Sequence, residues 1–195
     1  MEIDYLNQLV DLQVAQLSGF IDRSVGPKLA LLKYARVGFH SRGVTFDMYR
    51  ETGPDQEQLS TTINCQGIDW QVSHMAQVLS QFSTTLLHSA AVNLKLDGCW
   101  RDRSEGIDVD WRHFLLQFPT TQTLRVSWMH AEHVARALEH MVDGAFPSLD
   151  LIFLDGQPAS SVEKFVASRK FSGRPVTVVD TETEFDERVK SYISK

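Results

Sequence analysis

Short runs in which apolar and polar residues alternate recur along the whole chain, with apolar residues at helical spacing between them. Alternation at every second residue is typical of a strand with one buried face, whereas recurrence every three to four residues is typical of an amphipathic helix. The stretch at residues 92–128 contains both patterns in turn. Residues 92–96 alternate, residues 111–118 have helical spacing, and residues 124–128 alternate again. The rest of the chain repeats this strand–helix–strand unit.

Most of the alternating runs are followed by a helical pattern. The expected strands are centred near Leu12, Val37, Ile63, Leu94, Val126, Leu151 and Val178. These centres lie about 24 to 32 residues apart, which is around the period of leucine-rich repeats. Because strands alternate with helices, we predict a parallel sheet. A local hairpin is expected near residues 35–49, where residues 41–43 are typical of a turn.

Two architectures fit this alternation. An irregular leucine-rich-repeat solenoid keeps the strands of one parallel sheet in chain order, with all helices on one side. An ordinary three-layer α/β domain has a similar rhythm, but its strand order reverses at a switch point where ligands bind. We predict the solenoid, as a single domain over residues 1–195 with about seven strand–helix units.

Composition limits the class of protein. A chain of 195 residues is long enough for a sizeable core. A net charge of -6 argues against a general electrostatic surface for nucleic acid or anionic lipid. No apolar run approaches the roughly 20 residues that span a bilayer, and no secretory signal is visible. We therefore expect an intracellular protein, cytoplasmic or nuclear, with no nucleic-acid or membrane partner.

The two cysteines, Cys65 and Cys99, lie at or next to strand-like runs. Neither belongs to a CxxC pair, so thiolate metal binding and a redox motif are not expected. We interpret both as reduced, mostly buried thiols, although spacing alone does not decide their redox state.

Four segments carry a resemblance to a known family, and they comprise residues 63–75, 111–118, 123–126 and 165–176. They resemble the C-terminal part of the large family of basidiomycete (fungal) F-box proteins with degenerate leucine-rich repeats. The resemblance covers most of the chain, from about Leu9 onward. Its motifs are packing motifs, so they bear on the fold and carry no chemistry.

In that family an N-terminal F-box recruits a cullin-based ubiquitin ligase, and the repeats hold the substrate. The resemblance therefore implies a role in substrate or partner recognition, as in an F-box-type ligase adaptor. Because this sequence begins inside the expected repeats, ligase recruitment is not implied for it. The sequence leaves open whether a longer form carries an F-box.

Three patterns suggest chemistry, but each has a simpler explanation. His130, His133 and His140 lie off the apolar stripe of their helix, where a solvated polar face is expected. The acidic residues 102–110 do not match a calcium loop. No nucleophile motif surrounds Ser73. Trp70 and Trp111 begin helices in equivalent positions, which favours packing. We expect no catalytic residue, no metal and no cofactor.

The polar residues between the apolar strand positions define the candidate site. They should point to the open face of the sheet, opposite the core. Stacked in register, they would form a polar ladder with a central basic stretch at Lys95 and Arg125. The ladder consists of Gln13, Arg36, Asn64, Asn93, Lys95, Arg125 and Asp150. Since solenoids commonly bind partners on this surface, we predict a non-enzymatic protein–protein interaction module. An ordinary solvated sheet face is the simpler interpretation.

Two alternatives come from other classes. A small α/β-fold enzyme or ligand-binding protein would need a site at a strand's carboxyl end, and no such motif is recognised. A self-assembling repeat fragment is the other alternative, because the first and last repeats lack obvious polar caps and an uncapped parallel edge invites pairing with another copy. The sequence names neither the partner nor the oligomeric state.

Overall fold

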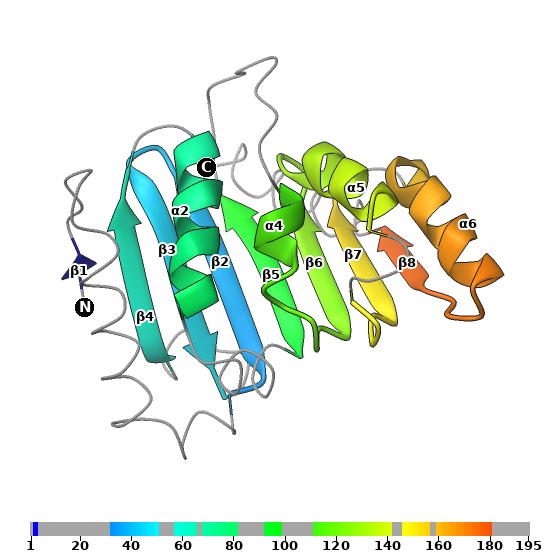
Figure 1. The fold of residues 1–195 in the computed structure, drawn as a ribbon, viewed down its shortest axis with the longest axis horizontal. Coiled ribbons are helices and arrows are strands. Elements are labelled where there is room, and N and C mark those ends of the chain that lie inside the picture. Colours follow the sequence, from blue (N-terminus) through cyan, green and yellow to red (C-terminus); the bar gives the residue numbers. More distant parts are fainter. Residues whose placement is uncertain are drawn as a thin grey trace, which may run out of the picture.

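The computed structural model describes residues 2–3, 32–50, 57–65, 68–81, 92–98, 111–141, 146–156 and 159–180. In this part of the chain a single sheet is covered on one face by helices (Figure 1). The predicted strand near Leu12 and the predicted final helix after Thr183 lie outside the described residues.

The described strands form an eight-stranded sheet. They are β1 (Glu2–Ile3), β2 (Tyr34–His40), β3 (Gly43–Tyr49), β4 (Glu57–Asn64), β5 (Asn93–Gly98), β6 (Thr123–Ser127), β7 (Leu151–Asp155) and β8 (Thr177–Asp180). Their order is β1-β4-β3-β2-β5-β6-β7-β8. Only β3 is antiparallel to its neighbours, so the predicted α/β class and mainly parallel sheet are confirmed.

The described helices lie on the same face of the sheet (Figure 1). They are α2 (Ile68–Gln81), α4 (Trp111–Leu115), α5 (Ala131–Glu139) and α6 (Glu163–Phe171), which follows the 3-10 turn η2 (Ala159–Val162). The predicted apolar stripe of α2 is confirmed, because Val72, Met75 and Leu79 are buried. None of these described helices combines the length and the apolar character that crossing a membrane requires.

The predicted chain order of strands holds for only one half of the sheet. From β5 to β8 each strand follows its predecessor through a helix. The prediction is wrong for β4, which lies at the far side of β3, while α2 returns the chain so that β5 pairs with β2. The two-residue turn at Ser41 and Arg42 makes β2 and β3 an antiparallel pair, and β4 then pairs with the far edge of β3, which leaves the other edge of β2 to β5. A turn that short joins only antiparallel strands, whereas a parallel pair needs a long crossover.

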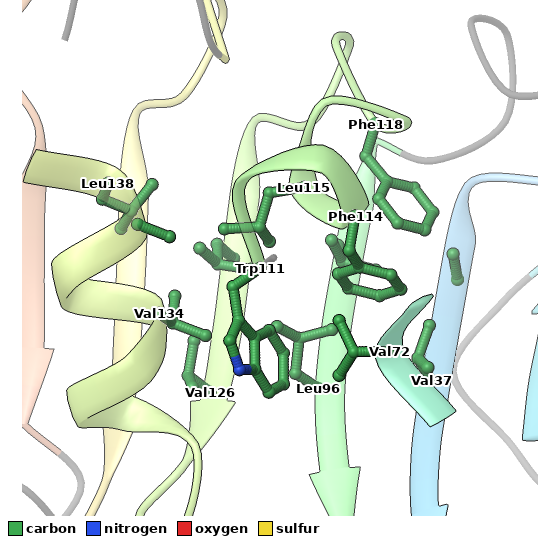
Figure 2. Close-up of a cluster of buried hydrophobic side chains, with 14 of the residues drawn as sticks. Val37, Val72, Leu96, Trp111, Phe114, Leu115, Phe118, Val126, Val134 and Leu138 are labelled. Carbon is green, nitrogen blue, oxygen red and sulfur yellow. The ribbon is translucent and has the colours of Figure 1, made fainter. Parts of the chain in front are cut away.

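An aromatic cluster fills the layer between the sheet and α4. Figure 2 shows side chains of the α4 segment packed against Val37, Leu96 and Val126 of the sheet. The ring of Phe114 lies 6.0 Å from that of Phe39 in β2, between ring centroids. This cluster therefore joins the β2–β3–β4 half of the sheet to the β5–β8 half.

The predicted packing role is confirmed for Trp111, which is buried in this cluster. It is wrong for Trp70, whose side chain is 58% exposed. The reason is helical geometry, because α2 presents Val72, Met75 and Leu79 to the sheet, and Trp70 lies on the opposite side of the helix.

Candidate binding surface on the open face of the sheet

Four of the predicted ladder residues lie on the face of the sheet that no described helix covers. Arg36, Asn93, Lys95 and Arg125 alternate with buried apolar residues in β2, β5 and β6. Arg36 pairs with Lys95, and Lys95 pairs with Arg125, across parallel neighbouring strands. The predicted side-by-side arrangement of Lys95 and Arg125 is therefore confirmed. Asn64 ends β4, opposite Gly43.

Two other ladder residues are not placed as expected. Gln13 lies outside the described residues. Asp150 precedes β7 and is not part of the ladder, because the predicted register of this strand was wrong by one residue. The structure buries Ile152 and Leu154, so Leu151 and Phe153 are the half-buried residues of the open face. A shift of one residue exchanges the two faces of a strand.

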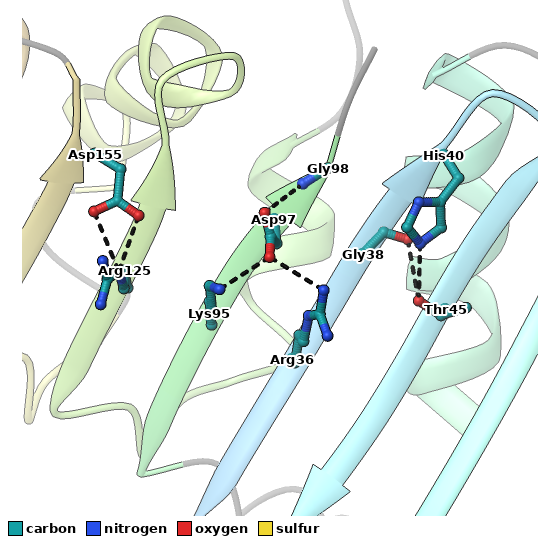
Figure 3. Close-up of polar contacts among 9 residues, drawn as sticks. All are labelled: Arg36, Gly38, His40, Thr45, Lys95, Asp97, Gly98, Arg125 and Asp155. Carbon is teal, nitrogen blue, oxygen red and sulfur yellow. Dashed lines mark hydrogen bonds and ion pairs between the residues drawn. The ribbon is translucent and has the colours of Figure 1, made fainter. Parts of the chain in front are cut away.

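The cations of the ladder are held by carboxylates on the same open face of the sheet, Asp97 of β5 and Asp155 of β7 (Figure 3). One oxygen of Asp97, Oδ2, accepts hydrogen bonds or ion-pair contacts from Lys95 Nζ at 2.9 Å and Arg36 Nη2 at 3.2 Å. Its other oxygen, Oδ1, accepts from the Gly98 N–H at 2.9 Å. Arg125 Nε donates to both oxygens of Asp155, at 2.9 and 3.2 Å. These contacts fix the directions of three long side chains.

Competing effects act on the pKa of Asp97. Burial by itself would raise it. The hydrogen bond and charge of Lys95, the charge of Arg36 and the Gly98 N–H together outweigh burial, so the pKa lies below its usual value. Asp97 is therefore a carboxylate at neutral pH, and the predicted basic stretch is largely balanced by acids rather than unopposed.

Sequence reasoning missed both acidic partners. Asp97 is two residues after Lys95, so strand alternation already places both on one face. Asp155 belongs to β7, and its contact with Arg125 depends on the pairing of β6 with β7. The three cations, Arg36, Lys95 and Arg125, have side chains that are 43%, 43% and 37% exposed. They are therefore ordered yet accessible.

Near its carboxyl end, β2 makes a close polar contact with β3. Thr45 Oγ1 donates to the carbonyl of Gly38 at 3.4 Å, and His40 Nε2 lies 3.4 Å from the same hydroxyl (Figure 3). A Cβ at Gly38 would lie 2.8 Å from Thr45 Oγ1 and 2.9 Å from His40 Nε2. Glycine therefore permits this close contact between β2 and β3.

A second candidate site is a cluster of histidine and aromatic rings at the carboxyl ends of the parallel strands. His130 was predicted to be solvated, and this is wrong, since it is only 2% exposed. It precedes the first turn of α5 and packs against Phe39 and Trp111, with ring centroids 4.9 and 5.5 Å away. On the other side of the cluster, the ring of His133 stacks on Trp111 at 6.4 Å.

Burial, together with the charge of His133, lowers the pKa of His130 to about 4, and the backbone and charge of Asp97 oppose this shift only in part. The imidazole is therefore neutral at physiological pH. His130 Nε2 and Trp111 Nε1 are buried without a hydrogen-bond partner in the described structure. Across the described residues, no group of three or more His, Cys, Asp or Glu side chains is arranged to hold a metal ion.

Cys65 is a free, half-buried thiol. Burial raises its pKa to about 11, so it is protonated at neutral pH and a poor nucleophile. Cys99 lies outside the described residues.

Comparisons of this chain with models of protein families, with curated proteins and with solved structures found no match. The resemblance to repeat proteins therefore stays a prediction.

Proposed function

We propose that this chain is an intracellular, non-enzymatic module of irregular leucine-rich repeats that recognises another protein through its open sheet face. The observation that carries the proposal is the row of Arg36, Lys95 and Arg125. These side chains lie in register on three adjacent parallel strands, on the face that no described helix covers. Asp97 and Asp155 hold them in place before any partner arrives. Such preorganisation lowers the entropic cost of binding.

The arrangement of β5 to β8 supports the repeat assignment. These strands lie side by side in chain order, their connections carry α4, α5 and α6, and these helices lie on one face. The β2–β3–β4 meander departs from a regular repeat. On the resemblance to F-box proteins, the partner would be a substrate delivered to a ubiquitin ligase.

The proposal predicts that Lys95→Gln combined with Arg125→Gln will lose partners that the wild type captures. We expect the recovery of specific partners from a cell lysate to fall by roughly tenfold or more, as for removal of central interface residues. Quantitative mass spectrometry of the captured proteins measures this.

The matched control is Arg136→Gln with Lys164→Gln, which removes two exposed cations from the helical side. This control should capture the same proteins as the wild type, and thermal melts should show that all three proteins are folded. Equal partner lists for the open-face variant and the wild type would contradict the proposal.

The reversal of strand order favours a second candidate, a small-molecule site at the carboxyl ends of β2 and β5. The chain leaves β2 toward β3 and β4, but it leaves β5 in the opposite direction toward β6. In open α/β sheets ligands bind at such a reversal. The unpartnered Trp111 Nε1 is a donor and His130 Nε2 an acceptor, which together suit a hydroxyl-bearing ligand.

A thermal-shift screen of small hydroxylated compounds tests this second candidate. A bound ligand should raise the melting temperature of the wild type, because ligand binding stabilises the folded state. The shift should disappear in Trp111→Phe, which keeps an aromatic ring but removes the N–H donor. Equal shifts in both proteins, or no shift with any compound, would rule out the site.

A further inference from the structure

Several buried polar atoms without a hydrogen-bond partner lie at the carboxyl ends of the parallel strands. Two of them belong to Trp111 and His130, which form the buried pair, and two others are Asp69 Oδ1 and Gln71 Oε1 in the first turn of α2. The amide of Gln71 donates to the carbonyl of His40, at the end of β2, at 2.6 Å. Because buried polar groups normally have a partner, this gathering indicates a site for a bound polar molecule.

Phe39 and His133 connect these groups in space. Phe39 precedes His40, and its ring contacts both rings of the buried pair. Burial raises the pKa of Asp69 and the charge of His133 opposes this shift, so the two side chains lie within electrostatic reach of each other. The ring of His133 is nearly parallel to the indole of Trp111, and Figure 2 shows the indole nitrogen on the side of the ring that faces α5. Because His133 is exposed and Trp111 is buried, the imidazole lies between the indole and solvent.

Two exposed tryptophans lie at the same edge of the sheet. Trp70 belongs to the first turn of α2, and Trp128 directly follows β6 and is 49% exposed. The ring of Trp70 lies 5.4 Å from that of His74, between centroids, so one of its sides is supported by the helix. An indole offers a flat apolar face, and aromatic rings beside a few convergent polar groups are typical of small-molecule sites.

We propose that the carboxyl edge of the sheet binds a neutral saccharide, with one hydroxyl bridging the buried pair and the sugar ring against an exposed tryptophan. The inference rests on the second candidate function, the small-molecule site, and names its ligand. The bridging hydroxyl accepts from Trp111 Nε1 and donates to His130 Nε2. Neighbouring hydroxyls donate to Asp69 and Gln71, and movement of the exposed His133 side chain admits the sugar.

Acceptors outnumber donors among these unpartnered atoms, and this selects the chemistry of the ligand. His130 Nε2, Asp69 Oδ1 and Gln71 Oε1 are acceptors. Trp111 Nε1 is a donor. The ligand must therefore supply several donors and at least one acceptor. A hydroxyl does both, whereas an ionised phosphate or carboxylate supplies acceptors alone.

The charges around the buried pair balance, so they do not favour an ion. Asp69 of α2 and Arg112 of α4 have opposite charges. Glu132 of α5 is paired with Arg136 of the same helix. A neutral ligand with many hydroxyls therefore fits these surroundings better than an anion or a cation.

NMR titration of the full, nitrogen-15-labelled chain with single sugars tests this inference. The panel consists of glucose, galactose, mannose, N-acetylglucosamine, maltose and cellobiose. We expect at least one sugar to shift the indole N–H signal of Trp111 with a saturable dose response. Trp111→Phe identifies this signal by its loss, and it should weaken binding by roughly tenfold, as for the removal of one buried hydrogen bond.

The exposed tryptophans can be replaced without disturbing the core. Trp70→Ala and Trp128→Ala are titrated with the same sugar, and one of them should weaken binding by roughly tenfold. Phe171→Ala is the matched control, because it removes an exposed aromatic ring at the end of α6, and it should bind like the wild type. Melting temperatures verify that every variant is folded.

Glucose 6-phosphate and choline are titrated as charged ligands. If either shifts the Trp111 signal and no neutral sugar does, the saccharide inference is wrong and the small-molecule site stands. If no compound shifts this signal, both the inference and the small-molecule site are wrong, and the open-face function is unaffected. Saturable sugar binding that neither Trp70→Ala nor Trp128→Ala weakens would also overturn the inference.

Discussion

Replacing Phe114 with alanine is expected to lower the free energy of unfolding by about 4 kcal/mol. Phe114 is fully buried, and its ring lies 5.8 Å from Trp111 and 5.5 Å from Phe118, between centroids. It also contacts Phe39 of β2. The variant would lose this apolar contact and leave a cavity at the junction of the two halves of the sheet. Urea unfolding followed by circular dichroism measures the change.

The effect should be large because α4 has little stability of its own. A helix of five residues is too short to persist without packing, so its position depends on its buried side chains. The control is Leu116→Ala, two residues after Phe114 but 45% exposed, and its effect should stay within about 0.5 kcal/mol. A loss below about 1 kcal/mol for Phe114→Ala would contradict the packing between α4 and β2.

Acidification from pH 6.5 to pH 4 is expected to cost about 3 kcal/mol of stability through His130. Its pKa is about 4 in the folded protein, against 6.5 for an ordinary histidine, because burial disfavours the imidazolium. The unfolded chain therefore binds the proton more tightly. Above pH 6.5, His130 is neutral in both states and does not lower the stability of the fold. As the pH falls from 6.5 to about 4, protonation of the unfolded chain lowers the free energy of unfolding, and below about pH 4 this loss levels off.

Other groups titrate in this pH range as well, so the prediction needs a variant. Burial lowers the pKa of His74, which adds to the loss, whereas burial raises the pKa of Asp69, which opposes it. His130→Phe removes the titrating group and keeps a ring against Phe39 and Trp111. Its stability should fall by about 3 kcal/mol less than that of the wild type between the two pH values.

His140→Gln is the matched control, because it removes an exposed histidine at the end of α5 and leaves the buried ring of His130 in place. Denaturant unfolding at several pH values provides the stabilities, and NMR titration provides the pKa of His130 directly. An NMR pKa close to that of a free histidine would refute the buried, neutral imidazole.

Local patterns in the sequence were sufficient to assign the buried and open faces of a strand where only one register fits. In β2, β5 and β6, polar residues separate apolar ones, and the predicted buried and open faces agree with the structure. The adjacent placement of Lys95 and Arg125 followed from this alternation. In β7 the run Leu151, Ile152, Phe153 and Leu154 fits either register, so local pattern could not choose between them.

The errors at β4 and His130 have a common cause. Periodicity identified the strand around Ile63 but says nothing about which strands become its neighbours. A helical wheel beginning with α5 says little about His130, which precedes the helix and is buried by Phe39 from β2 and Trp111 from α4. Both features depend on residues that are distant in sequence.

The sequence by itself determined the α/β class, the alternation of elements and the residues that face the core in most strands, because these depend on spacing within each segment. Only the tertiary structure decided the reversal of strand order between β2 and β5, the register of β7 and the pairing of Arg125 with Asp155. These features arise from contacts between segments, where turn length, the fit of the core and the neighbouring strand select one arrangement.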